Sequence, residues 1–314
     1  MLDLRRLRLL SEFARRGSIA ATAAALGYTP SAVSQQLAAL ERQTGTALLD
    51  RTARSAELTD AGRRLALRAD DILNMVEAAE AELSAESGTP TGRVVMTAFP
   101  TAAVAFAPAI ARSLAAHQQL TFALRQTSPG AGLAQVQSGE VDIALVDDWT
   151  GSLAEQAPRS LQFIHLRRDP LVLVLPPYHP LADPDEPLDL RALRDEPWMA
   201  TPPGEPSRQA FDRLLESVGG SPSVAWEFEG PHTLLNLVAR GIGIAALPAL
   251  ALVGGDPRVA VRQITDPAQA REVYAVARAA SVRRPAVAVT LRAIYAAAQE
   301  PLTYPGGEAL SAGE

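Results

Sequence analysis

Apolar residues recur at helical spacing through the N-terminal segment of the chain. Over residues 3–15 leucines and alanines return to one helical face, and Gly17 ends that run. Ser18 stands where a side chain caps the start of a second, short helix. Thr29 then caps a third helix that has Pro30 at its first position, where a missing N–H has no cost. Two short helices joined by a turn that contains glycine predict a helix-turn-helix.

The third predicted helix, which opens with TPSAVSQQLAALE at residues 29–41, has two different faces. On a helix of about 3.6 residues per turn, its apolar face packs on the other two helices and its polar face lies opposite. Small side chains with hydrogen-bond donors and acceptors suit the base edges and phosphates of a DNA major groove. A merely solvated face is the alternative, and the three-helix context favours contact with DNA. The apolar face carries Val33, Leu37 and Leu40, and the polar face carries Ser31, Ser34, Gln35 and Ala38.

A hairpin is predicted after the third helix. Residues 46–59 have the pattern of a strand, a turn and a second strand, with Arg51 and Arg54 near the turn. Two arginines at the tip of a hairpin beside a recognition helix are typical of a wing that contacts phosphates or the minor groove. The N-terminal segment is therefore predicted to be a winged helix-turn-helix.

A long helix is predicted to begin at Thr59 and Asp60. Its apolar residues recur at alternating spacings of four and three, which is the heptad seam of a two-stranded coiled coil. The seam is short and needs further contacts, but it predicts a dimer that presents two recognition helices to two half-sites. The run SGTPTG at 87–92 then predicts a flexible joint. The seam consists of Leu65, Ala69, Ile72, Val76, Ala79 and Leu83.

From Arg93 onward short apolar strands alternate with helices. The alternation predicts an α/β domain with mostly parallel sheets and a ligand crevice beyond the carboxyl ends of the strands. The last residues, 301–314, predict a disordered tail. The strands are expected at 93–98, 120–126, 141–146, 161–166, 171–176, 223–228, 243–248, 259–264 and 272–277, with helices near 103–116, 130–138, 205–218, 231–240 and 285–298.

The composition narrows the class of protein. A chain of 314 residues with 47% hydrophobic and 20% charged residues predicts a soluble protein of two or more domains. No charged-then-apolar leader opens the sequence, and the longest uncharged apolar run, at 241–255, contains Pro248 and is too short to cross a membrane. We therefore expect a cytoplasmic protein without membrane contact.

The basic residues are distributed unevenly. Residues 1–68 hold 11 arginines and 6 acidic residues, a net charge of +5, whereas the remaining 246 residues hold 18 and 29, a net charge of −11. A basic head on an acidic body predicts binding of nucleic acid at one end only. All 29 basic residues are arginine and there is no cysteine, which excludes lysine Schiff-base chemistry, a Walker-type lysine, disulfides and thiolate metal sites.

Signals for a metal, a cofactor or an enzymatic site are weak. GIGIAA at 241–246 fits a dinucleotide pattern, but it follows a predicted helix and opens a strand, the reverse of the order that a pyrophosphate site requires. The four histidines share no spacing typical of metal ligands. Asp147 and Asp148, beside Trp149, are neighbours at a strand end and are expected to point apart and to face solvent. No nucleophile elbow or S-x-x-K motif is present, so no cofactor, metal or enzymatic activity is expected.

The order of these parts and their sequence motifs resemble the LysR-type transcriptional regulators. The N-terminal motif is highly specific, and the later motifs occur in the right order, so that the resemblance extends from about residue 3 to about residue 298. The residues that carry it are GSIAATAAALGYTPSAVSQQLAALERQTGTALLDRTARSAELTDAG at 17–62, SGEVDIALV at 138–146, PLVLVLPPYHPLA at 170–182 and LLNLVARGIGIAALP at 234–248.

The resemblance implies an N-terminal winged helix-turn-helix, a dimerising linker helix and an α/β effector domain similar to the two-lobed, type II periplasmic binding proteins. It also implies a homodimer or homotetramer that binds an inverted-repeat operator in promoter DNA and regulates transcription in response to a small metabolite, with RNA polymerase as a further partner. The expected bounds are 1–60 for the head, 61–87 for the linker, 88–300 for the effector domain and 301–314 for the tail; lobe I takes 93–165 and 267–300, lobe II takes 166–266, and the crossovers lie near 163–168 and 263–269.

Site residues follow from the resemblance position by position. The expected DNA contacts are Thr29, Pro30, Ser31, Ser34 and Gln35, with Arg51 and Arg54 on the wing. Many relatives carry arginine where this chain has Gln35, and a neutral amide suits adenine better than guanine. The expected effector contacts are Phe99, Pro100, Thr101, Thr127, Ser128, Thr201, Pro202, Gly204, Glu229 and Gly230.

The expected effector site combines two opposing features. Helices that begin near Thr101 and Pro231 would direct free N–H groups at the crevice, which is a natural seat for a carboxylate. Glu229 argues against a purely anion-binding pocket if it points inward. A protein of another class also stays open here: a small-molecule-binding protein, similar to a transport receptor, whose head has lost operator binding. Ligand affinity without DNA affinity would favour that alternative, and the missing signal peptide disfavours it.

Overall fold

The computed structural model describes residues 1–51, 56–217, 219–220, 224, 226–254, 258–265 and 269–301, without the side chains of Arg51, Ser84, Glu86, Ser87 and Ser217. These residues form two compact units, Met1–Gly88 and Thr89–Glu314. From position 302 onward the expected tail lies outside the described residues.

The first unit opens with three helices, α1 (Leu4–Arg16), α2 (Ile19–Leu26) and α3 (Pro30–Thr44). The predicted caps are present: the Ser18 hydroxyl accepts from the Ala21 N–H at 3.1 Å, and the Thr29 hydroxyl accepts from the Ala32 N–H at 3.2 Å. All three helices end at a glycine with positive φ, as a left-handed C-cap requires. Their apolar faces meet in one core that contains Leu7, Leu10, Phe13, Val33, Leu37 and Leu40.

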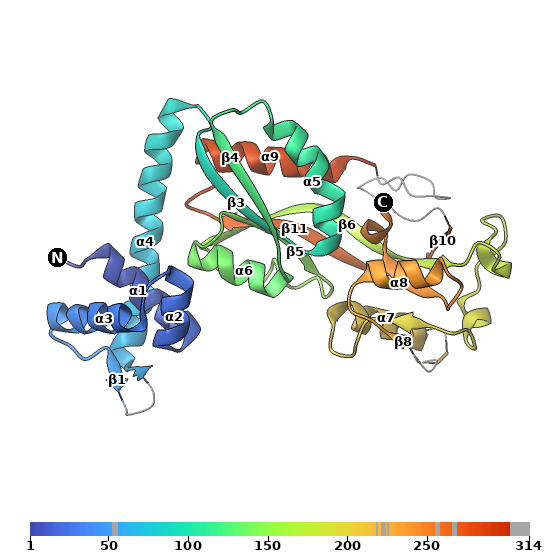
Figure 1. The fold of residues 1–314 in the computed structure, drawn as a ribbon, viewed down its shortest axis with the longest axis horizontal. Coiled ribbons are helices and arrows are strands. Elements are labelled where there is room, and N and C mark those ends of the chain that lie inside the picture. The colour runs from blue at the N-terminus through green and yellow to red at the C-terminus, as the bar shows by residue number, and fades with distance from the viewer. Residues whose placement is uncertain are drawn as a thin grey trace. The chain divides into compact units, whose positions relative to one another are not determined.

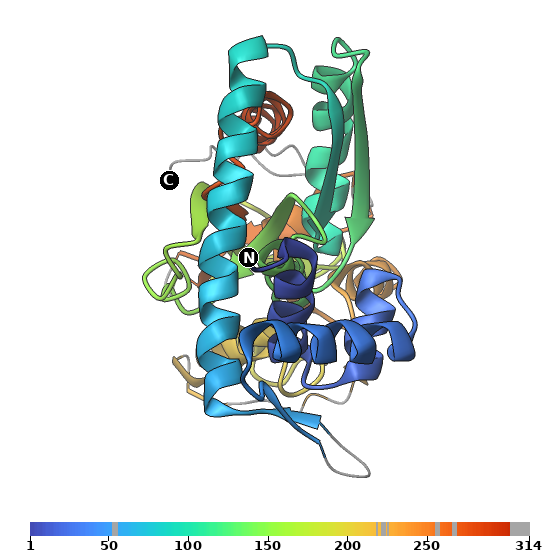
Figure 2. The same cartoon turned by 90° about the vertical axis from the view of Figure 1, so that its left-hand side faces the viewer.

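A short hairpin and a long helix complete this unit. Strands β1 (Leu49–Arg51) and β2 (Ala56–Leu58) pair antiparallel. The Glu41 carboxylate on α3 accepts from the Leu48 and Leu49 N–H groups, both at 2.9 Å, and so attaches the hairpin to the third helix. Helix α4 (Asp60–Ser87) follows and continues well beyond the other helices (Figure 2). Its Gly62 lies so close to the hairpin that a Cβ there would be 2.1 Å from the Leu48 carbonyl oxygen.

The N-terminal half of α4 belongs to the core of its own unit. Ala69 is completely buried against α1 and its neighbours, and Leu65 and Ile72 pack on the same core. Ala69 is therefore not available to a second chain, so its prediction as a seam residue is wrong; the apolar periodicity around it reflects packing on α1. Ala79 and Leu83 are exposed, and Leu65, Ile72 and Val76 are partly exposed, so these five stay candidates for a dimer contact.

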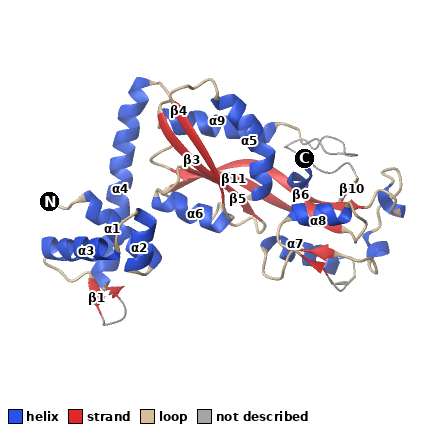
Figure 3. Ribbon diagram, in the orientation of Figure 1, coloured by secondary structure: helices blue, strands red, loops and turns tan. Residues whose placement is uncertain are grey.

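The second unit is built on a sheet of seven described strands in the order β10-β6-β11-β5-β3-β4, with β9 paired to β6, and on a two-stranded sheet of β7 and β8 (Figure 1). Helices α5 and α9 pack together on one face of the larger sheet and α6 covers the other (Figure 3). The strands are β3 (Gly92–Ala98), β4 (Leu120–Gln126), β5 (Ile143–Asp148), β6 (Leu161–Leu175), β7 (Met199–Ala200), β8 (Trp226–Glu227), β9 (Ala245–Pro248), β10 (Ala260–Gln263) and β11 (Ala270–Arg278). The helices are α5 (Pro100–Leu114), α6 (Pro129–Ser138), α7 (Pro206–Ser217), α8 (Pro231–Val238) and α9 (Pro285–Gln299), with 3₁₀ turns at Pro180–Ala182, Leu190–Leu193 and Ala249–Leu252.

The expectation of mostly parallel sheets is wrong. Strand β3 pairs in parallel with β4 and β5, and β7 pairs in parallel with β8. Strand β6, however, is antiparallel to β9, β10 and β11, and β11 is antiparallel to β5. The alternation of strands and helices in the sequence could not show that β6 and β11 pair antiparallel with their neighbours.

Strand β6 also replaces two expected strands. The charged residues and the proline between 166 and 171 separate two apolar runs in the sequence, but the chain continues through them as one strand. Arg167 and Asp169 are both completely buried there. Arg167 donates to the Ala298 carbonyl at 3.1 Å, and Asp169 pairs with Arg271 on β11. The expected first crossover at 163–168 is thus part of a continuous strand, and residues 266–268 of the second lie outside the described residues.

Candidate functional site

The polar face of α3 is exposed, as its periodicity predicts. Ser31 and Gln35 are exposed and Ser34 is half-buried, opposite the buried Val33, Leu37 and Leu40. Pro30 is exposed as the first residue of the helix, and the exposed Thr29 caps it. Beside this face the Arg6 Nε donates to the Gln36 side chain at 3.1 Å, which adds a cation that the sequence pattern did not single out. The arrangement presents short polar side chains together with positive charge.

Of the two wing arginines, the structure describes only the backbone of Arg51. Arg51 is the last residue of β1, and its side chain is not among those described. Arg54 lies outside the described residues. Their proposed contact with DNA stays a prediction.

The second unit contains a cavity of about 580 Å³, into which most of the expected effector contacts face. Pro202 and Gly204 do not line it; Glu205 and Ser207, which follow that turn, line it instead. The expected residues that do line the cavity are Phe99, Pro100, Thr101, Thr127, Ser128, Thr201, Glu229 and Gly230.

The cavity lies where strands end and helices begin. Phe99 and Pro100 follow β3, Thr127 and Ser128 follow β4, and Asp147 is near the end of β5. Carboxyl ends of neighbouring parallel strands meet at one edge of a sheet, which is why residues far apart in sequence gather there. Four described helices begin at this place with a proline that lines the cavity: Pro100, Pro129, Pro206 and Pro231.

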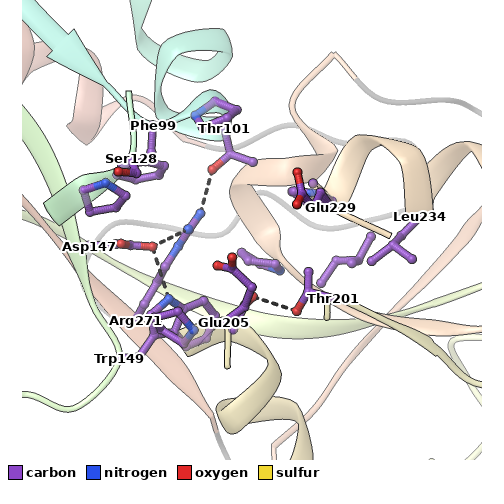
Figure 4. Close-up of a pocket in the computed structure, with 18 of the residues that line it drawn as sticks. Phe99, Thr101, Ser128, Asp147, Trp149, Thr201, Glu205, Glu229, Leu234 and Arg271 are labelled. Atoms are coloured by element: carbon purple, nitrogen blue, oxygen red, sulfur yellow. Dashed lines mark hydrogen bonds and ion pairs between the residues drawn. The ribbon is translucent and has the colours of Figure 1, made fainter. Parts of the chain in front are cut away.

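Arg271, which the sequence pattern missed, occupies one wall of the cavity (Figure 4). Its guanidinium donates to Asp147 at 2.7 Å, to Asp169 at 2.8 Å and to the Thr101 hydroxyl at 2.7 Å. It also lies over the Phe99 ring at 4.7 Å and near the Trp149 ring at 5.5 Å. No sequence signal marks this arginine, because its partners come from β3–α5, β5 and β6.

Asp147 and Asp148 point apart, as expected, but neither simply faces solvent. Asp147 lines the cavity, where it also accepts from the Trp149 indole N–H at 3.1 Å. Asp148 is buried and accepts from the Leu153 and Thr150 N–H groups at 2.7 and 2.8 Å. The expectation of two solvated carboxylates is therefore wrong, because the turn after β5 folds back over Asp148.

Burial and hydrogen bonding act in opposite directions on the pKa values of two buried carboxyls, Asp148 and Asp169. Burial alone would raise the pKa of Asp148, but the hydrogen bonds from Leu153 and Thr150 outweigh it, so that the pKa is lowered. Burial raises the pKa of Asp169, while Arg271 and the Leu250 N–H act to lower it. The pairing with Arg271 is what makes a charged carboxylate tolerable at this depth.

Two more glutamates face the cavity from α7 and from the loop before α8. Glu205 precedes α7 directly, and Glu229 precedes Gly230, the N-cap of α8. Both are exposed, and within the described part of the chain neither has an ion-pair partner. Figure 4 draws both on the side of Arg271 opposite to Asp147.

Within the described residues no three histidine or acidic side chains come together in a way that could hold a metal ion. Nor does any helix in the described ranges combine the length and the apolar character needed to cross a membrane.

Comparisons with known proteins match both units to families. Residues 4–63 match the family described as bacterial regulatory helix-turn-helix protein, lysR family. Residues 87–299 match the LysR substrate binding domain.

Individual relatives agree with the family match along most of the chain. The HTH-type transcriptional regulator YfeR of Shigella flexneri, described as uncharacterized, is 31% identical over 281 residues, 88% of either chain. The probable HTH-type transcriptional regulator LrrA of Synechococcus elongatus is 28% identical, over 95% of this chain and 98% of the relative.

Solved structures share the fold. A full-length OxyR variant from Pseudomonas aeruginosa has a TM-score of 0.68 at 18% identity, with 94% of this chain and 95% of that chain covered. Full-length CbnR in complex with its target DNA has a TM-score of 0.54 at 20% identity, with 95% and 100% covered. With its helix-turn-helix and its substrate-binding unit both matched, the chain belongs to the LysR family of transcriptional regulators.

Proposed function

We propose that this regulator binds operator DNA through the exposed face of α3 and responds to a small molecule held in the cavity at Arg271. Thr29, Pro30, Ser31, Ser34 and Gln35 are the proposed contacts on α3, joined by Arg51 and Arg54 on the wing. The carrying observation is the exposure of Ser31 and Gln35 opposite a buried apolar face, in a head with a net charge of +5 over residues 1–68. CbnR, which shares the fold, was solved with its target DNA.

The effector contacts are proposed from the residues that line the cavity. Phe99, Thr101, Thr127, Ser128 and Glu229 are among the proposed ligand contacts, and Trp149 and Glu205 join them. A ligand here would touch β3–α5, α6, the turn after β5 and the starts of α7 and α8 at once. If the ligand contacts these elements better in one arrangement than in another, its binding shifts the equilibrium toward that arrangement.

The same proposal covers the oligomeric state, the cellular location and the partners of the chain. The chain acts in the cytoplasm as a homodimer or homotetramer on an inverted-repeat operator, works with RNA polymerase and has no enzymatic activity. The proposed dimer contacts on α4 are the exposed Ala79 and Leu83 and the partly exposed Leu65, Ile72 and Val76. Two heads related by a twofold axis would match two half-sites.

Gel-shift titration with DNA from upstream of the protein's own gene tests the proposal. We expect a sequence-specific complex whose affinity falls steeply as salt rises, because cationic side chains that bind phosphate release counterions. Unrelated DNA of the same length and base composition is the control. Equal affinity for both DNAs, or no complex at low salt, would refute operator binding.

A further inference from the structure

The side chains around the cavity do not balance in charge. Asp147, Glu205 and Glu229 face it, against the single guanidinium of Arg271. No other charged residue lines this cavity in the described part of the chain. Among the side chains, a bound molecule would therefore meet an excess of negative charge, which the partial positive charge at the starts of the four helices offsets only in part.

Arg271 is already occupied by protein carboxylates. Its side chain is 6% exposed and forms ion pairs with Asp147 at 2.7 Å and with the fully buried Asp169 at 2.8 Å. Its remaining hydrogen bond in this network goes to the Thr101 hydroxyl. Two carboxylates neutralise one guanidinium, so a ligand carboxylate would have to displace Asp147 to be bound by Arg271.

Glu205 and Glu229 are in the opposite position. Both are exposed in the open part of the cavity, and their charges are not neutralised by an ion pair with any described residue. Glu205 directly precedes α7 and Glu229 lies two residues before α8, and both line the same cavity. Opposite charge in this place is favourable, and like charge is repelled.

Aromatic side chains add a second feature that suits a cation. Phe99, Trp149 and Phe211 all line the cavity. Trp149 and Phe99 already contact the Arg271 cation, so a ligand cation would use the ring surface that Arg271 leaves uncovered. An aromatic wall also provides apolar surface for the body of a small ligand.

From this charge pattern we infer that the effector carries an organic cation, a primary amine in the simplest case, whose ammonium group is bound by Glu205 and Glu229. The inference rests on the proposed function of the cavity and names the class of ligand. The cavity gives the place of the ligand. Its preference for a positively charged ligand follows from the two exposed glutamates and from Arg271, which is already paired with protein carboxylates.

A matched set of three ligands tests this preference: benzylamine, benzyl alcohol and benzoate have nearly the same shape and differ in charge. Their dissociation constants are measured on the full chain from the fluorescence of Trp149, which lines the cavity. Trp226 is exposed outside the cavity and is replaced by phenylalanine so that it does not contribute to the signal, whereas Trp198 is buried and is kept. We expect benzylamine to bind most tightly and benzoate most weakly. Glu205→Gln and Glu229→Gln should each reduce the preference of amine over alcohol by about threefold to tenfold, a modest effect because both carboxylates are exposed.

Glu216→Gln serves as the matched control, since this glutamate is exposed on α7 and does not line the cavity. It should leave the preference unchanged. Tightest binding of benzoate, equal binding of the three ligands, no binding of benzylamine, or a preference unaffected by both glutamine variants would overturn the inference. A gel shift with the same protein separates the two failures: a specific complex with DNA leaves the proposed regulator intact while the ligand class is wrong, and loss of DNA binding refutes the regulator itself.

Discussion

Asp147 and Asp148 are adjacent on β5 and have different roles because strand residues alternate in direction. Asp147 faces the cavity and pairs with Arg271, whereas Asp148 turns to the other side and holds the turn that carries Trp149. A sequence pattern identifies the strand end, but which of two carboxylates enters the site depends on what packs on either side.

Asp148→Asn should lower the free energy of unfolding by about 1–3 kcal/mol, because an amide cannot replace a carboxylate that accepts several N–H groups. The pKa of Asp148 is lowered in the folded protein, so its contribution is present above the ordinary carboxyl pKa and is lost as pH falls through the folded value. Denaturant unfolding at neutral and acid pH measures this. The exposed Glu155→Gln is the control; an equal effect of both variants, or a difference that grows in acid, would contradict the role of Asp148.

Gln35→Ala should change which bases are preferred at one position of each half-site, by about 1–3 kcal/mol, because an amide can bond to an adenine edge. Thermal unfolding should stay the same, since Gln35 is exposed. Selection of binding sites from randomised DNA measures the preference. Ser34→Arg should alter it as well, and identical selected sequences for both variants and the parent would refute the assignment of this face.

At the scale of elements, α4 shows how one apolar pattern serves two purposes. Its first half packs on α1 and completes the core of the head, where Ala69 is buried. Farther along, Ala79 and Leu83 are exposed and Val76 is partly so. The heptad pattern runs through both halves, so the sequence could not distinguish a contact within the chain from a contact between chains.

Two aspartate variants of α4 separate these purposes. Leu83→Asp should weaken the dimer without lowering the melting temperature of the head, because Leu83 is 70% exposed in the single chain and a charge in a subunit contact must be desolvated. Ile72→Asp should destabilise the head itself, since Ile72 packs on its core. Sedimentation and thermal unfolding measure the two effects. Leu67→Asp is the control, being 69% exposed on a different side of the helix; a dimer unaffected by Leu83→Asp would count against the seam.

At the scale of the whole second unit, β6 and β11 pair along most of the length of β11 inside the larger sheet. Arg271 and Asp169 stand opposite each other on these strands, and Asp169 also accepts from the Leu250 N–H at 2.9 Å. Arg271 reaches Thr101 and Asp147 on the other side. This buried network connects the cavity wall with the strands that pass through the unit.

Arg271→Gln should destabilise the full chain by about 3–5 kcal/mol, because it leaves Asp169 buried without its counter-ion. Adding Asp169→Asn should recover part of the loss, because the uncompensated charge is then removed. A double-mutant cycle of denaturant unfolding measures the coupling. Additive effects of the two substitutions would show that the ion pair does not contribute in this way.

Most of the local structure could be predicted from sequence alone. The caps at Ser18 and Thr29, the glycine helix ends and the two faces of α3 follow from neighbouring residues, whose interactions do not depend on the rest of the fold. Most strand and helix bounds were close for the same reason, except at β6, at β7, which was not predicted, and at β8, which is shorter than the strand expected at 223–228. Eight of the residues expected at the crevice line the cavity, because strand-to-helix junctions are visible in the sequence.

The order of residues was enough to specify a basic helix-turn-helix head and an α/β body whose strand ends carry polar residues. Three features became visible only in the folded chain. Strand β6 continues through its buried charges, and Arg271 pairs with Asp169, 102 positions away in the sequence. Asp147 and Glu205 line one cavity, and Ala69 is buried within its own unit. The physical reason is that charge pairing and burial depend on groups brought together by folding, whereas capping and periodicity act within a few residues of the chain.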